Sequence, residues 1–166
     1  MEVQTIKISV TANSTRRYGV RGYYAIFVSD GKGSSYELKF SERPAKVLYL
    51  FAMRHSNGFQ RRALSRDNYR ELLDIYFHVY GLNGADRAKV RLNSNFDRFV
   101  SQGMAALRRS IAASIPNNKK LVEGLTVADP RSTGGLVYIP FVKGASAKLS
   151  TVNKIKQHNK IFKYDD

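Results

Sequence analysis

Short segments in which apolar and polar residues alternate predict a small antiparallel sheet at the N-terminal end of the chain. In the first segment, Ile6, Ile8 and Val10 alternate with polar residues, as expected of a strand that buries one face. Two further segments, 23–28 and 36–40, are joined by a polar turn and predict a β-hairpin.

The central part of the chain has apolar residues at helical spacing and predicts three helices. Ser41 is a candidate N-cap for the first helix, Pro44 fits its first turn, and Gly58 marks its end. The second helix ends at Gly81 and has the most regular apolar stripe, in which apolar residues recur every three or four positions. That stripe consists of Tyr69, Leu72, Leu73, Tyr76, Phe77 and Tyr80.

A polar linker, 82–93, separates the second helix from the third, which begins at Ser94 or Asn95 and ends near Ile115. One side of the third helix is apolar, and Gly103 in its middle weakens it by about 1 kcal/mol relative to alanine. The opposite side consists of Arg98, Ser101, Gln102, Ala105, Arg108 and Arg109.

The C-terminal part of the chain predicts a second hairpin followed by a tail. Two β-prone segments, 121–128 and 136–142, flank a turn-rich segment. Pro140 cannot donate to a strand ladder, so we expect its strand at a sheet edge. The last stretch, 143–166, is rich in lysine and poor in aliphatic residues, which predicts a basic tail.

These elements define one domain, 1–142, and the tail. The expected parts of the domain are an antiparallel sheet (1–40), a three-helix core (41–115) and a C-terminal hairpin (119–142). The fold class expected from this order is α+β.

Positive charge is the unusual property of the composition. Twenty-eight Lys and Arg residues oppose thirteen Asp and Glu residues, which gives a formal net charge of +15. Such an excess favours a polyanionic partner, with nucleic acid as the first candidate and an anionic membrane surface as the second. The alternative explanation is that the charge only keeps the protein soluble.

Several classes of protein are disfavoured by what the sequence lacks. No segment reaches the roughly 18 consecutive apolar residues of a membrane span. The first ten residues lack the apolar segment of a signal peptide, so we expect a cytoplasmic protein without a membrane partner.

Groups that carry chemistry are few. The chain has no cysteine, and its three histidines are scattered without metal-ligand spacing. Glu37 and Lys39 share the polar face of a short strand, where a surface charge pair explains them better than a nuclease motif does. We therefore expect no metal, no cofactor and no enzymatic activity.

The order sheet, three helices and hairpin resembles a winged helix-turn-helix, specifically the output domain of OmpR/PhoB-type response regulators. Residues 72–81 resemble the positioning helix of that family. Residues 100–111, which end in Leu-Arg-Arg-Ser-Ile, resemble its recognition helix. Residues 134–139 resemble the return strand of its wing, and the resemblance covers about 3–142. No receiver domain precedes the module in this sequence, so phosphorelay control is not implied.

The resemblance implies that the third helix enters the major groove of DNA, with Ser101, Gln102 and Ala105 toward the bases. Arginine reads guanine through its bidentate fork, and glutamine pairs with adenine. The expected base-proximal residues are Arg98, Ser101, Gln102, Ala105, Arg108 and Arg109. A solvated helix face is the alternative interpretation.

Basic residues outside the third helix are candidate phosphate contacts. Arginines just before a helix can clamp a phosphate together with the helix N–H groups, and lysines in a tail can follow the backbone without reading sequence. The residues expected in these roles are Arg61, Arg62, Arg66, Arg131, Lys154 and Lys156. A solvated loop and a soluble terminus are the alternatives.

The function expected from this sequence is binding of double-stranded DNA, with regulation of transcription as its use. One alternative is a sequence-nonspecific packaging or virion-associated protein, which the alanines on the groove face favour. An RNA-binding module and a protein–protein adaptor are further alternatives. The sequence also leaves open a homodimer.

Overall fold

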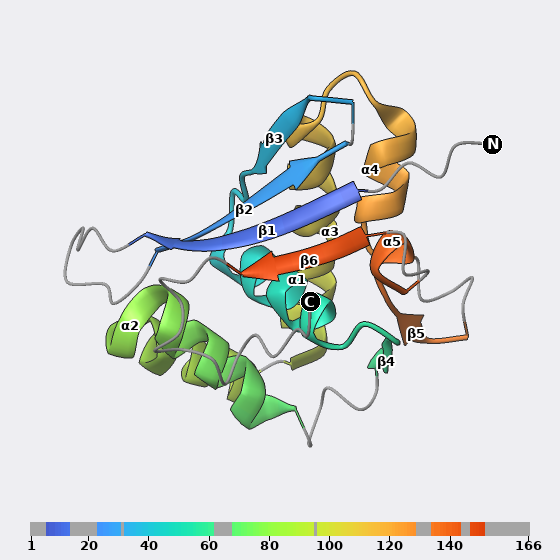
Figure 1. Cartoon of the computed structure of the whole chain (residues 1–166). Coiled ribbons are helices and arrows are strands. Elements are labelled where there is room, and N and C mark those ends of the chain that lie inside the picture. Colours follow the sequence, from blue (N-terminus) through green and yellow to red (C-terminus); the bar gives the residue numbers. More distant parts are fainter. Residues whose placement is uncertain are drawn as a thin grey trace.

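The computed structural model describes residues 6–13, 23–30, 32–61, 68–94, 96–128, 134–143 and 147–151 (Figure 1). These residues form both strands and helices, which confirms the α+β class. A four-stranded sheet and a two-stranded sheet are present within the described part of the chain.

The larger sheet has the strand order β3-β2-β1-β6. Its strands are β1 (Ile6–Asn13), β2 (Tyr23–Ser29), β3 (Ser35–Leu38) and β6 (Ala147–Thr151). The first three are antiparallel, as predicted. Alternation places Ile8, Ile26, Val28 and Leu38 in the core, whereas Phe27 is 37% exposed on the opposite face.

Strand β6 corrects the prediction of a tail that begins at residue 143. Residues 147–151 pair in parallel with β1, and Leu149 lies opposite Ile8. The sequence carries the alternation of a half-buried strand here, but the many lysines suggested a solvated segment. The sheet is therefore mixed, and residues from both ends of the chain share it.

Helices α1 (Arg43–Arg54) and α3 (Phe96–Ser114) lie together on one face of this sheet (Figure 1). Every residue of α1 from Ala45 to Met53 is buried, so α1 lies at the centre of the core. The N-cap is Glu42 rather than the predicted Ser41. The Ser41 backbone N–H instead donates to Ser110 Oγ of α3, with an N–O distance of 3.2 Å.

Helix α2 (Tyr69–Ser94) extends beyond the predicted stop at Gly81. Gly81 has φ 79° and ψ −176°, a backbone conformation that is almost restricted to glycine, and it divides α2 into two helical halves. The predicted linker 82–93 is wrong, because this segment is helical. Ala88 and Leu92 are buried and lie four residues apart, which is the helical spacing of its weak apolar stripe.

A short helix replaces the first strand of the predicted C-terminal hairpin. Helix α4 (Lys119–Leu125) begins after Asn118, whose side chain accepts a hydrogen bond from the Leu121 backbone N–H at 3.2 Å. This N-cap lies between the predicted end of the third helix near Ile115 and the start of the predicted hairpin at residue 119. Helix α5 (Pro140–Lys143) likewise replaces the end of the second strand, since proline fits the first position of a helix.

The smaller sheet pairs β4 (Phe59–Gln60) with β5 (Leu136–Val137). The Ala128 backbone N–H donates to the Tyr138 carbonyl at 3.0 Å, so Ala128 lies beside the residue that follows β5. The predicted strand 121–128 is thus wrong for residues 121–125, which are helical. The hydrogen bond between Ala128 and Tyr138 still joins the two segments that were predicted to pair.

Candidate nucleic-acid interface

Helix α3 presents one polar face to solvent and one apolar face to the core. Arg98, Ser101, Gln102, Ala105 and Arg109 are all exposed, as expected from their common side of the helix. The residues of the opposite side are buried: Phe99, Val100, Gly103, Met104, Ala106 and Leu107. The exposed face therefore extends over several helical turns and is not covered by other described elements.

Arg108 differs from its neighbours on α3. Its side chain is half-buried at the edge of the exposed face, and its Nη2 atom is buried without a hydrogen-bond partner within the described part of the chain. A buried guanidinium nitrogen without an acceptor is costly, so Arg108 is a poorer candidate for base contact than Arg109.

Arg61 joins the exposed face of α3 to the smaller sheet. Its guanidinium Nη2 donates to Ser101 Oγ at 2.6 Å, although the two residues are 40 positions apart in sequence. The Arg61 backbone N–H donates to the Gly135 carbonyl at 3.0 Å, which extends the pairing of β4 with β5. Two segments predicted separately as DNA contacts therefore meet at one surface.

The other predicted phosphate contacts are not placed. Arg62, Arg66, Arg131, Lys154 and Lys156 lie outside the described residues. The described residues nearest to Arg131 in sequence form backbone hydrogen bonds: the Ala128 N–H donates to the Tyr138 carbonyl, and the Gly135 carbonyl accepts from the Arg61 N–H.

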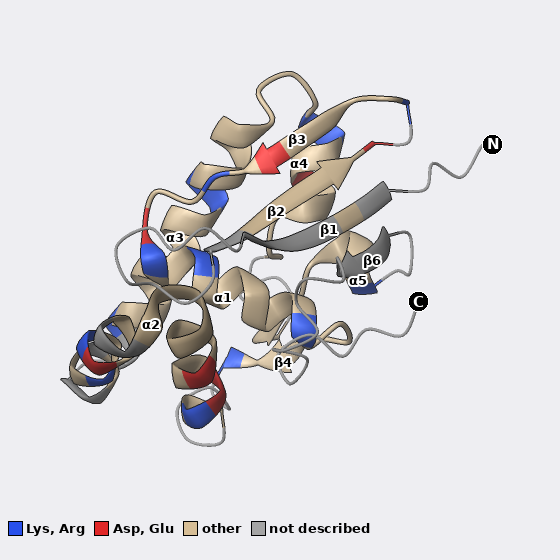
Figure 2. Ribbon diagram, turned by 60° about the vertical axis from the view of Figure 1, so that its left-hand side comes forward, with Lys and Arg blue, Asp and Glu red and all other residues tan. Residues whose placement is uncertain are grey.

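The Glu71 carboxylate of α2 is bonded to two side chains at the end of α1. Glu71 accepts hydrogen bonds from Arg54 Nε at 3.0 Å and from His55 Nε2 at 3.1 Å, which ties the end of α1 to the start of α2. Figure 2 shows basic and acidic residues interleaved on α2. By contrast, the charged residues of α3 from Arg98 onward are all arginines. The described exposed face of α3 therefore carries only positive side chains, Arg98 and Arg109, whereas acidic residues lie among the basic ones of α2.

One lysine is placed where charge is disfavoured. Lys46 of α1 is only 8% exposed, and burial lowers its pKa from 10.5 to about 8, while the nearby Glu37 acts weakly in the opposite direction. This lysine belongs to the core and not to the α3 face, so it is not a candidate contact for an external anion.

Comparison with known proteins does not assign the chain to a family: no family, curated protein or solved structure matches it. Among the described residues, no group of three or more His, Cys, Asp or Glu side chains could hold a metal ion. No helix within those residues combines the length and apolar character that crossing a membrane requires.

Proposed function

We propose that this chain binds double-stranded DNA as a winged helix-turn-helix protein and that it regulates transcription. In this proposal the exposed face of α3 lies in the major groove, and Arg61 contacts the phosphate backbone beside it. The observation that carries the proposal is the hydrogen bond from Arg61 to Ser101.

That hydrogen bond supports the proposal because it orders a long cationic side chain on the candidate interface. An arginine that is already positioned loses less conformational freedom when it meets a phosphate. The Arg61 backbone also bonds to Gly135, which belongs to the predicted wing. Arg61 therefore contacts both the exposed face of α3 and the predicted wing. Such phosphate contacts fix the register of a protein on a duplex, which is what base contacts from α3 require.

The side chains on the face suit base contact in its N-terminal part. Arg98 and Gln102 are exposed one helical turn apart, and both side-chain types read base edges in the major groove. Ala105 follows on the same side and offers only a methyl group, which packs against a thymine methyl.

A second candidate function, sequence-nonspecific binding of nucleic acid, is favoured by the C-terminal part of the same face. Ala105, Ala112 and Ala113 are all exposed there, and Arg109 is the polar side chain among them. A surface with few hydrogen-bonding groups reads few bases, and its affinity then comes mainly from charge.

The test is binding of labelled duplex DNA at several salt concentrations. If about six phosphates are contacted, the logarithm of the affinity should fall with the logarithm of salt with a slope near −5. Arg61→Ala should weaken binding about tenfold and reduce the slope by about 1. Ser101→Ala keeps all charges but releases Arg61, so a smaller loss with an unchanged slope is expected.

The matched control is Lys32→Ala, which removes one exposed positive charge from the β2–β3 turn. Its effect on duplex affinity should be much smaller than that of Arg61→Ala. A flat salt dependence with retained binding, or equal losses in the two variants, would contradict the proposal. Tighter binding of single-stranded RNA than of duplex DNA would favour the RNA-binding alternative.

A further inference from the structure

The break at Gly81 places the second half of α2 against the start of α1. There the two helices line an open pocket of about 250 Å³, which is the cavity considered below. Its lining consists of Arg43, Pro44, Tyr76, Gly84, Arg87 and Ala88. This volume is far larger than the roughly 10–15 Å³ that one water molecule needs, so the cavity can hold a polyatomic ligand.

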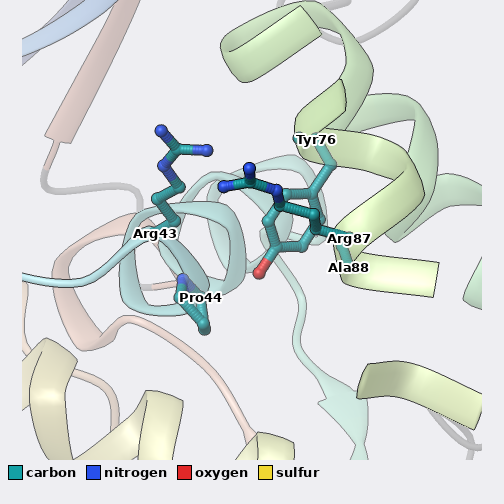
Figure 3. Close-up of a pocket in the computed structure, with 6 residues that line it drawn as sticks. Arg43, Pro44, Tyr76, Arg87 and Ala88 are labelled. Carbon is teal, nitrogen blue, oxygen red and sulfur yellow. The ribbon is translucent and has the colours of Figure 1, made fainter. Parts of the chain in front are cut away.

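The cavity combines an apolar wall with two guanidinium groups. Pro44, Tyr76 and Ala88 supply the wall, and Arg43 and Arg87 are exposed at its rim. Figure 3 shows both guanidinium groups on the same side of the pocket in that view, with Pro44 and the Tyr76 ring below them. No carboxylate is among the residues that line it.

The guanidinium of Arg43 is held in place without being neutralised. Its central carbon lies 4.8 Å from the centroid of the Tyr80 ring, a cation–π arrangement that leaves its N–H groups available. Among the described residues, neither Arg43 nor Arg87 takes part in a salt bridge, although Glu42 and Asp86 are their neighbours in sequence.

The start of α1 adds to the positive potential of this cavity. Arg43 and Pro44 are at the beginning of the helix, its first turn contains no acidic residue, and the Glu42 side chain does not cap it. The N-terminal end of a helix carries a partial positive charge and uncapped N–H groups, both of which favour an anion.

We propose that this cavity is a phosphate-binding site, with Arg43 and Arg87 as the ligands of the phosphate oxygens. Two planar guanidinium groups match the oxygens of a phosphate, and the apolar wall accommodates the organic part attached to it. The phosphate comes either from a free phosphorylated small molecule or from the backbone of bound DNA. The site does not depend on the groove contact of α3 and is a second, separate anion site.

The experiment is a titration of the full chain with inorganic phosphate and with a nucleoside 5′-monophosphate, at an ionic strength held constant with chloride. Binding is followed by NMR of the arginine side-chain N–H signals. We expect saturable shifts of the Arg43 and Arg87 signals, and at least tenfold weaker binding in the double variant Arg43→Gln/Arg87→Gln. Arg87→Lys keeps the charge but loses the fork, so it should bind several-fold more weakly than the wild type.

The matched control is Lys89→Gln, which removes one exposed charge from the same half of α2 but does not line the cavity. It should leave phosphate binding unchanged. Thermal unfolding of each variant shows whether the protein is still folded, since Arg43 also contacts Tyr80. Absence of a saturable response in the wild type, or an undiminished response in the folded double variant, would overturn the proposal.

Duplex DNA distinguishes the two sources of phosphate. If the site holds a backbone phosphate, the double variant should weaken duplex binding and reduce the salt slope by about 2. If it holds a free phosphorylated molecule, duplex affinity should stay close to that of a matched double charge removal elsewhere, Lys32→Ala/Lys89→Gln. Loss of duplex binding in Arg61→Ala, together with no saturable phosphate response in the wild type, would leave the groove proposal standing while this one fails. Saturable phosphate binding without duplex binding would do the reverse.

Discussion

Positive charge meets two different surroundings in this protein: the interior around α1 and the outward face of α3. In the interior, Lys46 is surrounded by the core, and burial disfavours its charged form. On α3, Arg98 and Arg109 are exposed, and Arg61 is hydrogen-bonded beside them. The same kind of charge is thus disfavoured by burial in one region and lies at the surface in the other.

This difference separates stability from binding. A substitution in the interior should change the free energy of unfolding, whereas one on the α3 face should change affinity for nucleic acid. A net charge of +15 alone does not distinguish these cases, because it counts the buried lysine together with the exposed arginines.

The largest expected effect is the pH dependence caused by Lys46. Its pKa is about 8 in the folded state and 10.5 in the unfolded state, so the unfolded state binds more protons between these values and stability rises with pH across that window. The rise attributable to Lys46 is about 3 kcal/mol. Lys46→Met removes the titrating group, so we expect the variant to be more stable than the wild type near neutral pH. This difference in the free energy of unfolding should decrease by about 3 kcal/mol as pH rises from about 8 to 10.5.

Urea unfolding of the wild type and Lys46→Met at a series of pH values measures this difference. Titration of tyrosines and other lysines is common to both proteins and cancels in the comparison. Lys39→Met, at an exposed lysine, is the control and should follow the wild-type profile. Parallel profiles for the wild type and Lys46→Met would show that the interior tolerates the charge.

The next effect concerns base contact by the α3 face. Arg109→Ala should lower duplex affinity by about 1–3 kcal/mol and relax preference at particular base pairs, whereas Lys154→Ala in the basic segment should cost less and act alike on all sequences. Arg108→Ala is less informative, because its half-buried side chain affects folding as well. Selection from random duplexes with each variant is the measurement, and sequence-blind losses of equal size would favour the packaging alternative.

The smallest effect tests the buried side of α3. A Cβ atom at Gly103 would overlap Leu48 Cδ1 of α1 and lie 3.5 Å from Pro44 Cβ. Overpacking a core costs about 1–3 kcal/mol, and the gain in helix propensity from alanine offsets roughly 1 kcal/mol of this cost. Gly103→Ala should therefore lower the free energy of unfolding by about 1 kcal/mol.

The control for this substitution is the neighbouring Gln102→Ala, on the exposed side. It should change the free energy of unfolding by less than about 0.5 kcal/mol. If Gly103→Ala were more stable than the wild type, α1 and α3 would accommodate the added methyl group without a loss of packing energy. The close contact with Leu48 would then not be the reason for a glycine at this position.

The sequence predicted those helices and strands whose residues carry a clear local pattern of apolar and polar positions. The β2–β3 hairpin, α1 and the first half of α2 follow from alternation, from a proline in a first turn and from a regular apolar stripe. The exposed side of α3 was also predicted correctly except for Arg108, because a helical period fixes which residues share a face.

The parts that the sequence did not predict depend on distant residues or on weak local signals. Gly81 was correctly identified as a break, but the polar segment after it resumes a helix. Strands β4 and β5 are two residues long and exist only through their pairing. The contact of Arg61 with Ser101 and the pocket between Arg43 and Arg87 each join separate segments of the chain, which no local pattern records.

The parallel pairing of β1 with β6 determines when the fold can be completed. Ile6 lies opposite Ala147, so nearly all of the intervening chain must emerge from the ribosome before this pair can form. Until then one edge of β1 has no strand partner, and pairing across so long a loop is slow relative to the formation of the helices between. We therefore expect the helical layer to form first and the sheet to close last as the chain is synthesised.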